Sequence, residues 1–215
     1  MSPKAISVLE SRCFSRRRLS RYCRAAFTIV ELLCVIAVIV IVAGLVVFSP
    51  GLGRSTGLTT AGNQVMEDLA YAREFAVSSN EPTEVWFLRP TGGASLNATQ
   101  IYTVDQNGTW SPLGGVHHLP ASIGIDSGTS LSSLLTASTK KVWTSQAQAP
   151  ISGYGTSYDA WAIRFMPDGT VGNATQNVYV TLHDVSKGDK LTALPANYAL
   201  INIDYVTGAV SSYRP

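Results

Sequence analysis

An apolar run near the N-terminus constrains this chain more than any other stretch. Between Phe27 and Phe48 the only ionisable side chain, apart from the thiol of Cys34, is the carboxyl group of Glu31. A helix over these positions would be about 33 Å long at about 1.5 Å per residue, which matches a hydrocarbon core of about 30 Å. The sequence therefore predicts that residues 27–49 form a transmembrane helix.

The single carboxyl group in this run needs an explanation. On insertion scales an acidic side chain at the centre of a bilayer costs about 2.5–3.5 kcal/mol. Glu31 therefore either has a partner or a function, or it lies at the depth of the lipid headgroups and reaches water there. The residues alone leave both interpretations open.

The residues before the run form a basic leader. Residues 1–26 hold seven Lys and Arg residues against the single acid Glu10, a net charge of +6. The whole chain has 16 basic and 14 acidic residues, so residues 27–215 keep 9 basic and 13 acidic residues, a net charge of −4. Basic residues that flank an apolar span stay on the cytoplasmic side. We therefore expect the leader in the cytoplasm and the rest of the chain beyond the membrane.

Residues 26–33 read Ala-Phe-Thr-Ile-Val-Glu-Leu-Leu, directly after the basic leader. This motif resembles the class III signal of type IV prepilins and type II secretion pseudopilins. The resemblance implies that a prepilin peptidase cuts between Ala26 and Phe27 and that the new N-terminal amine of Phe27 is methylated. It also assigns an assembly role to Glu31, which stands at the acidic position of the family. Ala26 departs from the family pattern, which usually has Gly there.

The same resemblance implies how such a chain works. The apolar helices would leave the bilayer and bury against one another as the core of a fibre. The carboxylate of Glu31 would pair with the N-terminal amine of a neighbouring subunit, which offsets the cost of burying both charges and fixes the axial register. The implied partners are a prepilin peptidase and methyltransferase, the inner membrane, and other pilin or pseudopilin subunits. A pilus and a secretion pseudopilus both fit the sequence.

Other interpretations of this N-terminus fit less well. An ordinary secretory signal has an apolar region of about 7–15 residues and then a small-residue cleavage site, whereas this run is longer and ends in Phe-Ser-Pro-Gly. An Arg-rich leader also resembles an organelle transit peptide, but a transit peptide does not require a Phe-x-x-x-Glu start to an apolar run. The basic cluster Arg16–Arg18 lies close to the run, so we interpret it as a topology signal rather than a nucleic-acid patch.

Residues 50–82 are expected to form a kink and then an amphipathic stem helix. Pro50 and the glycines after it predict the kink or interruption. The pattern that follows predicts a helix from about residue 59 to residue 78, ended by Asn80, Glu81 and Pro82. Its apolar stripe consists of Leu58, Ala61, Val65, Leu69, Ala72 and Ala76. The charged side chains are expected to point largely elsewhere; they are Glu67, Asp68, Arg73 and Glu74.

Beyond residue 82 the apolar period changes from helical to two, so residues 83–215 predict an exported antiparallel β domain with one buried face. The runs that carry this pattern are Val85–Leu88, Ile101–Val104, Trp161–Phe165, Val178–Leu182 and Ile201–Tyr205. Asn107-Gly108 is a strong hairpin signal, and turns are indicated at Asp168-Gly169 and Thr207-Gly208.

One long N-terminal helix followed by antiparallel strands resembles the pilin fold. We therefore expect an α+β protein whose transmembrane and amphipathic helix packs on an antiparallel β-sheet. The stretch Phe165–Gly169 and the closing hairpin at Gly208 are similar to the strand pattern of H-type minor pseudopilins, and the Verru_Chthon cassette proteins have a similar overall pattern. Residues 126–158, rich in Ser, Thr, Gly and Ala, predict long loops that bury little apolar surface and that either face a partner or are tolerated insertions.

No catalytic site, metal site or cofactor is expected. His117, His118 and His183 have no carboxylate or thiol at metal-ligand spacing, so we interpret the first two as an exposed strand or turn and the third as the polar face of a strand. Glu81 and Glu84 flank a Pro and are expected to face solvent, without the geometry of an acid–base pair. Phosphate-binding and nucleophile motifs are missing from the sequence. An enzyme is therefore not predicted.

A nucleic-acid partner is also not expected, because phosphate contacts dominate such binding and residues 27–215 are net negative. The adjacent bases Lys140 and Lys141, beside Trp143, are interpreted as a solvated loop. The leading prediction is a minor fibre subunit in the bacterial inner membrane, single-pass, with a cytoplasmic N-terminus and a periplasmic or extracellular C-terminal domain. The alternative is a membrane-tethered β-sheet binding domain that does not polymerise, with an uncleaved leader and no sensitivity at Glu31.

Overall fold

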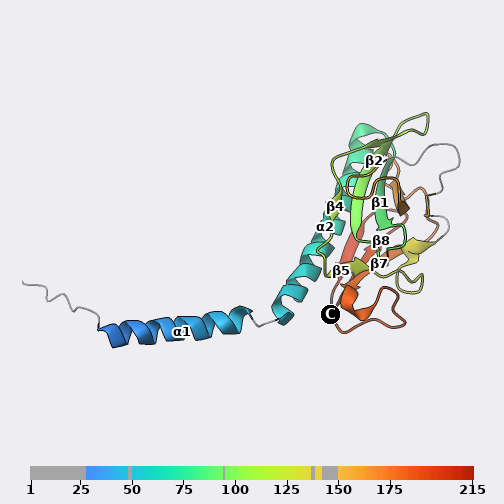
Figure 1. Cartoon of the computed structure of the whole chain (residues 1–215). Coiled ribbons are helices and arrows are strands. Elements are labelled where there is room, and N and C mark those ends of the chain that lie inside the picture. The colour runs from blue at the N-terminus through green and yellow to red at the C-terminus, as the bar shows by residue number, and fades with distance from the viewer. Residues whose placement is uncertain (1–27, 48–49, 94, 137–138, 142–149) are drawn as a thin grey trace, which may run out of the picture. The chain divides into compact units, whose positions relative to one another are not determined.

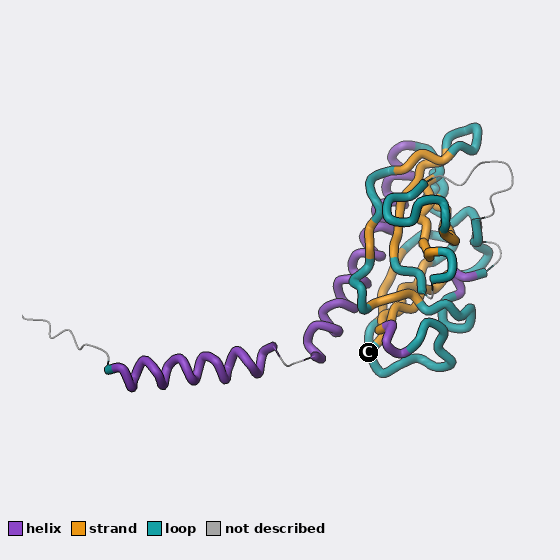
Figure 2. The backbone as a smooth tube through the Cα atoms, viewed as in Figure 1, coloured by secondary structure: helices purple, strands orange, loops and turns teal. Residues whose placement is uncertain are grey.

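The computed structural model describes residues 28–47, 50–93, 95–136, 139–141 and 150–215. The chain divides into two compact units, Met1–Phe48 and Ser49–Pro215. The first unit contains the helix α1, and the second contains the helix α2 and the β-strands (Figures 1 and 2). The predicted leader and the predicted cleavage site at Ala26 and Phe27 lie outside the described residues.

Helix α1 (Ile29–Val47) follows the apolar run. Its large side chains from Ile29 to Val42 are exposed within their unit, with exposed fractions from 47% to 79%. The predicted span of residues 27–49 begins and ends outside the described residues. Over the described ranges, the structure has no helix that is both long enough and apolar enough to cross a membrane.

Helix α2 (Pro50–Ser79) begins nine residues before the predicted start at residue 59. Proline is tolerated at the start of a helix because the first amide groups have no intrahelical partner, so its missing N–H costs nothing there. Gly51 lies inside the helix rather than in a break. The predicted end is confirmed: Asn80 has a φ of 57°, the left-handed conformation that often terminates a helix.

The predicted apolar stripe of α2 forms the centre of the core. All six of its side chains, from Leu58 to Ala76, are at most 1% exposed. They pack against apolar residues of both β-sheets in one cluster, as expected for an amphipathic helix that stabilises its fold through one face. The expectation for Asp68 is wrong, because this carboxyl group is only 5% exposed and turns inward.

The β domain contains two antiparallel sheets rather than the single sheet that was predicted. In the described residues the first sheet has the order β3-β2-β1-β6, with β4 also paired to β2, and the second has the order β5-β7-β8-β9. The first sheet consists of β1 (Thr83–Pro90), β2 (Ala98–Val104), β3 (Trp110–Pro112), β4 (His117–His118) and β6 (Tyr158–Phe165). The second consists of β5 (Ile123–Ile125), β7 (Val178–Asp184), β8 (Tyr198–Ile203) and β9 (Val210–Tyr213).

Strand β1 is buried on both faces. Val85 and Phe87 belong to the core cluster beneath α2, whereas Trp86 and Leu88 belong to a second cluster on the opposite face. The second cluster includes residues from the loops, such as Ile151. Since both faces of this sheet are covered, the continuous apolar run of β1 replaces the alternation expected of a half-exposed strand.

The described residues of the segment 126–158 are more closely packed than predicted. The segment contains the short 3-10 helix η1 (Ser133–Leu135), and Leu134 is fully buried. The hydroxyl oxygens of Ser132 and Ser133 accept hydrogen bonds from backbone N–H groups of β7. A serine-rich segment can therefore lie against a strand because its hydroxyl groups satisfy the amides there.

Arg73 ties α2 to two turns of the β domain. Its Nε donates hydrogen bonds to the carbonyl oxygens of Gly169, at 3.3 Å, and Thr207, at 3.0 Å. Gly208 lies between them with a φ of +64°, and a Cβ at this position would collide with the carbonyl oxygen of Gly169. Only glycine combines this conformation with this close approach.

Candidate functional site

The start of α1 places Glu31 beside a helix cap. Thr28 precedes the helix, and its hydroxyl oxygen accepts a hydrogen bond from the backbone N–H of Glu31 at 3.2 Å. This Thr-x-x-Glu spacing is that of a capping box, in which the N3 residue can equally be Gln. The sequence contained this signal, but the prediction for Glu31 did not use it.

The side chain of Glu31 can act in two ways, on the helix itself or on another molecule. It lies in the first turn of α1, where a negative charge interacts favourably with the helix dipole. Its side chain is also exposed within its unit. A change to Gln would preserve the capping box and remove the charge, so the two roles can be tested apart.

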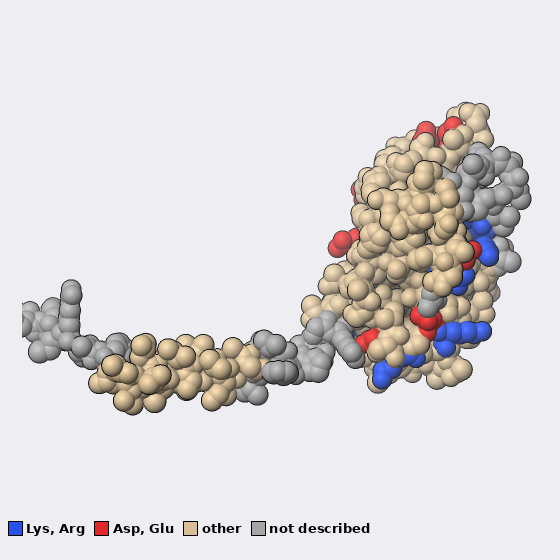
Figure 3. All heavy atoms as spheres, in the orientation of Figure 1, with Lys and Arg blue, Asp and Glu red and all other residues tan. Residues whose placement is uncertain are grey.

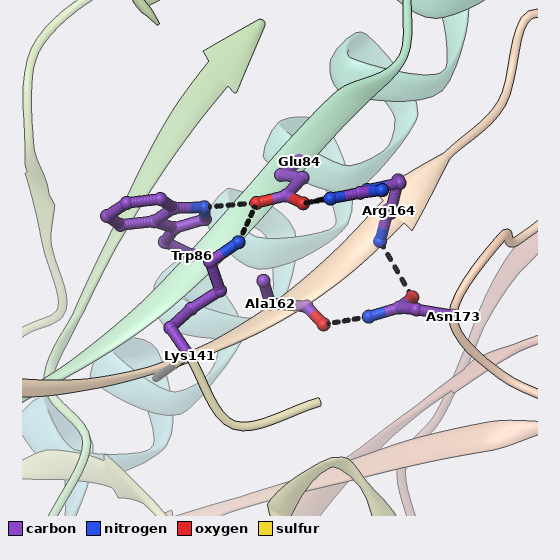
Figure 4. A network of polar contacts seen from close by, with 6 residues as sticks. All are labelled: Glu84, Trp86, Lys141, Ala162, Arg164 and Asn173. Atoms are coloured by element: carbon purple, nitrogen blue, oxygen red, sulfur yellow. Dashed lines mark hydrogen bonds and ion pairs between the residues drawn. The ribbon is translucent and has the colours of Figure 1, made fainter. Parts of the chain in front are cut away.

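A buried charge network lies on the first sheet, where sequence reasoning expected a solvent-facing carboxylate (Figure 4). Glu84 on β1 is 2% exposed. Its Oε1 accepts a hydrogen bond from Nε of Arg164 at 2.8 Å, and its Oε2 accepts one from Nζ of Lys141 at 2.8 Å and one from Nε1 of Trp86 at 2.7 Å. The prediction for Glu84 is wrong because the cations that compensate it come from positions 57 and 80 residues away.

The electrostatics of this network favour the ionised carboxylate. Burial alone raises the pKa of Glu84, but the charge and hydrogen bond of Lys141, the charge of Arg164 and the Trp86 N–H outweigh it and hold the pKa below its usual value of 4.5. Burial lowers the pKa of the Lys141 ammonium, and the attraction of Glu84 opposes that shift. One buried negative charge is thus shared by two cations.

Lys141 is not the solvated lysine that was predicted. Its side chain is 13% exposed, and its Nζ lies 4.1 Å from the ring centroid of Trp110 and 5.2 Å from that of Trp86. Lys140 fits the prediction better, with a side chain that is 46% exposed and 3.7 Å from the carboxylate of Asp159. The adjacent Trp143 lies outside the described residues.

The paired histidines lie on an exposed strand, one of the two placements, strand or turn, that were predicted for them. His117 on β4 is exposed, and its Nδ1 lies 2.7 Å from a carboxylate oxygen of Asp68 on α2. The other oxygen of Asp68 accepts a hydrogen bond from the hydroxyl of Thr99. His118 stacks on the ring of Tyr154. These contacts fasten β4 to the helix and to the loops.

His183 was expected on the polar face of a strand, and this prediction is wrong. The side chain is fully buried, with Nδ1 3.0 Å from the carbonyl oxygen of Asp184 and Nε2 3.5 Å from Asp126. Asp126, equally buried, accepts backbone N–H bonds from Gly128 and Leu191, both at 2.7 Å. The pair therefore joins two loops at one end of the second sheet. Within the described ranges, no group of three or more His, Cys, Asp and Glu residues could hold a metal ion.

Comparison with known proteins gives the family. The model of the family described as Type II transport protein GspH matches residues 61–194, more than half of the chain. The chain belongs to the GspH family. It is accordingly a minor pilin or pseudopilin subunit of a pilus or type II secretion fibre, and it assembles with other such subunits. The predictions of a pseudopilin-type family and of an α+β pilin-like fold are confirmed.

The chain is also similar to two solved structures. The type IV minor pilin FimU of Pseudomonas aeruginosa aligns with 14% identity and a TM-score of 0.45, over 74% of this chain and 92% of that chain. The minor pseudopilin EpsH from the type 2 secretion system of Vibrio cholerae aligns with 8% identity and a TM-score of 0.43, over 74% of this chain and 97% of that chain. Curated protein sequences give no significant match. Proteins of the family are structural subunits, associated with a membrane and carrying a periplasmic domain.

Proposed function

We propose that this GspH-family chain is made as a prepilin. A prepilin peptidase cuts it between Ala26 and Phe27, and the new amine of Phe27 is methylated. Before assembly, residues 27–49 lie in the inner membrane, with the N-terminus in the cytoplasm and residues 83–215 on the other side. After assembly, the same segment joins the apolar core of the fibre, and residues 50–82 form the stem.

The observation that carries this proposal is the coincidence of three features at one place. The signal-like motif at residues 26–33 continues into helix α1, whose apolar side chains are exposed in their own unit. Lipid first, and then the helices of neighbouring subunits, would cover these side chains. Glu31 is the one ionisable group in the first turn of this helix.

Glu31 acts in assembly through its charge. Its carboxylate pairs with the N-terminal amine of a neighbouring subunit and so fixes the axial register, because an apolar surface alone would tolerate several registers. The chain itself has a structural role and no catalytic activity, as its family membership suggests.

The change Glu31→Gln tests this role while it preserves the capping box. In a host with a prepilin peptidase and a fibre assembly system, we expect normal cleavage and at least about tenfold less of the variant in sheared fibres, because the amine of the neighbour loses its counter-charge. The measurement is quantitative immunoblotting of the cleaved protein in the membrane and fibre fractions.

Thr28→Ala is the matched control, because it removes the cap and leaves the charge. We expect this variant to enter fibres to within about twofold of the unchanged chain. Normal incorporation of Glu31→Gln, or equal losses in both variants, would contradict the proposed role. A leader that stays attached would instead favour the membrane-tethered binding domain.

A further inference from the structure

Strand β9 forms an open edge of the second sheet. In the described residues β9 pairs with β8 alone, whereas β5 at the other edge is bridged to Leu96 through Ile125. The last three residues of β9, Ser211 to Tyr213, are exposed. An edge strand presents unpaired N–H and C=O groups that can pair with another chain. The fold therefore offers a place where a strand of a partner can be added.

The hairpin before β9 decides which backbone groups face outward. The N–H of Asp204 donates a hydrogen bond to the carbonyl oxygen of Ala209 at 2.9 Å. The next pair along the ladder is Ile203 with Val210. Hydrogen-bonded and non-hydrogen-bonded pairs alternate in an antiparallel ladder, so the N–H and C=O of Val210 point away from β8, and so do those of Ser212. Over the described ranges, no hydrogen bond outside the strand pairs reaches these four groups.

A pocket of about 570 Å³ lies where β9 begins. Helix α2 lines it with Arg73, Glu74 and Val77, Val210 lines it from β9, and Asp168 lies at it as well. Val77 is 50% exposed, so an apolar side chain of a partner would cover it favourably. We call this pocket, together with the outward edge of β9, the β9 edge site.

The pocket end of the β9 edge site is negatively charged. Glu74 and Asp168 are exposed, and neither forms an ion pair within the described part of the chain. With Arg73, whose Nε is already bonded to the carbonyl oxygens of two turns, they give a net charge of −1. In Figure 3 red acidic atoms stand out along the side of the domain where α2 lies, whereas most blue basic atoms gather on the other side. A basic side chain is therefore the favoured occupant of this end.

The opposite end of β9 carries a positive charge. Arg214 follows the strand, and its guanidinium donates hydrogen bonds to the neutral acceptors Ser55 and Asn197. The two ends of the β9 edge site thus differ in charge. A segment that lies along this edge is bound more tightly when its basic end lies at Val210 than when that end lies at Arg214.

We propose that the β9 edge site binds an extended segment of a partner protein, added antiparallel to β9 with a basic residue at its C-terminal end. Antiparallel pairs are slightly more stable per residue than parallel ones, and in this direction the C-terminal end of the segment lies beside Glu74 and Asp168. Backbone hydrogen bonds to Val210 and Ser212 would supply affinity, and the pocket would supply specificity. A second copy of this chain fits less well, because residues 27–215 carry a net charge of −4.

The test is a titration of the full-length chain, in a neutral detergent at low ionic strength, with the acetylated and amidated peptide Thr-Val-Thr-Val-Thr-Lys. Fluorescence anisotropy of the labelled peptide measures binding, and amide hydrogen exchange followed by NMR locates it. We expect saturable binding, and we expect the amides of Val210 and Ser212 to exchange at least about tenfold more slowly in the complex.

Ser212→Pro removes one of the outward N–H groups. Proline is tolerated on an edge strand where the N–H would face solvent, so we expect a folded variant that binds the peptide at least about tenfold more weakly. Ser212→Ala is the matched control, because it keeps the N–H, and it should bind within about twofold of the unchanged chain. Glu74→Lys changes an exposed side chain of α2 rather than the strand, and it should weaken binding by at least about fivefold.

Four results would overturn the proposal. They are a peptide that does not bind, binding that leaves the exchange of Val210 and Ser212 unchanged, equal losses in Ser212→Ala and Ser212→Pro, and equal binding of the peptide in which Glu replaces the Lys. The test involves neither cleavage nor fibre assembly, so its failure leaves the roles of Phe27 and Glu31 untouched.

Discussion

The two helices of this chain differ in what covers their apolar side chains. The apolar stripe of α2 is at most 1% exposed, because both sheets of its own unit pack against it. The apolar side chains of α1 are exposed within their unit, at 61% for Leu33 for example. A surface of that kind normally marks contact with another molecule or a membrane. We conclude that α2 belongs to the folding core, whereas a role of α1 in assembly is our proposal.

Two carboxylates show the same contrast. Glu84 is buried and bound by Lys141, Arg164 and Trp86 of its own unit. Glu31 is exposed at the start of α1, where its backbone N–H donates a hydrogen bond to the hydroxyl oxygen of Thr28. The charge of Glu84 is therefore compensated within its own unit, whereas the side chain of Glu31 is exposed at the surface of its unit.

The largest expected effect comes from a matched pair of leucine substitutions. Leu69→Ala removes a side chain that is fully buried in α2 and should lower the free energy of unfolding of the β domain by about 2–5 kcal/mol. Leu33→Ala in α1 should change it by less than about 0.5 kcal/mol. Urea unfolding followed by tryptophan fluorescence measures both. If both variants lower the free energy of unfolding by similar amounts, α2 does not contribute to the folding core more than α1 does.

A smaller effect is expected when Glu84 is removed. Glu84→Ala leaves Lys141 without its counter-charge and should destabilise the β domain by about 2–3 kcal/mol, less than for a fully buried pair because the Arg164 side chain is 37% exposed. Glu31→Ala should leave the same unfolding curve unchanged. If Glu84→Ala unfolds at the same urea concentration as the unchanged chain, the network does not stabilise the fold.

The pH dependence of stability should follow Glu84. Its pKa in the folded chain lies below the usual value of 4.5, so its contribution is fully present above pH 4.5 and is lost as the pH falls through the folded pKa. Stability should therefore fall more steeply below pH 4.5 in the unchanged chain than in Glu84→Gln, which cannot titrate. Asp105, Asp168 and Asp204 also have lowered pKa values but contribute equally to both curves. If the acid unfolding curves of the unchanged chain and of Glu84→Gln are parallel, Glu84 does not cause the loss of stability at low pH.

The smallest effect is expected at the hairpin of Gly208. Gly208→Ala combines a positive φ with a collision against the carbonyl oxygen of Gly169. We therefore expect it to lower the free energy of unfolding by about 1–2 kcal/mol. Gly188→Ala, at a φ of +99° but with open space around its Cβ, is the control for the conformational part alone. A smaller loss at Gly208 than at Gly188 would show that the contact between the turns does not matter.

The local patterns of the sequence predicted most of the fold. The apolar stripe of α2 and the alternation in β6, β7 and β8 depend on neighbours in sequence, and these elements were predicted correctly. The early start of α2 was missed because Pro and Gly break helices in the interior but Pro is tolerated in the first turn. The division into two sheets was missed because periodicity does not say which strands pair.

The candidate sites were predicted unevenly for a related reason. The role of Glu31 rests on a motif that is continuous in sequence, and it stays a prediction. Glu84 and His183 were misplaced because their burial depends on partners far away in the chain, Arg164 and Asp126. A carboxylate at the edge of the apolar run Val85–Leu88 was the one local sign that Glu84 lies in a covered sheet.

The most direct test of the account is the N-terminal residue and mass of the protein purified from membranes of a host with a prepilin peptidase. The account predicts a chain that begins with N-methylated Phe27, so that residues 1–26 are lost and helix α1 starts two residues after the new N-terminus. A chain that still begins at Met1, in a host that processes its own prepilins, would contradict the account and make the membrane-tethered binding domain the better explanation.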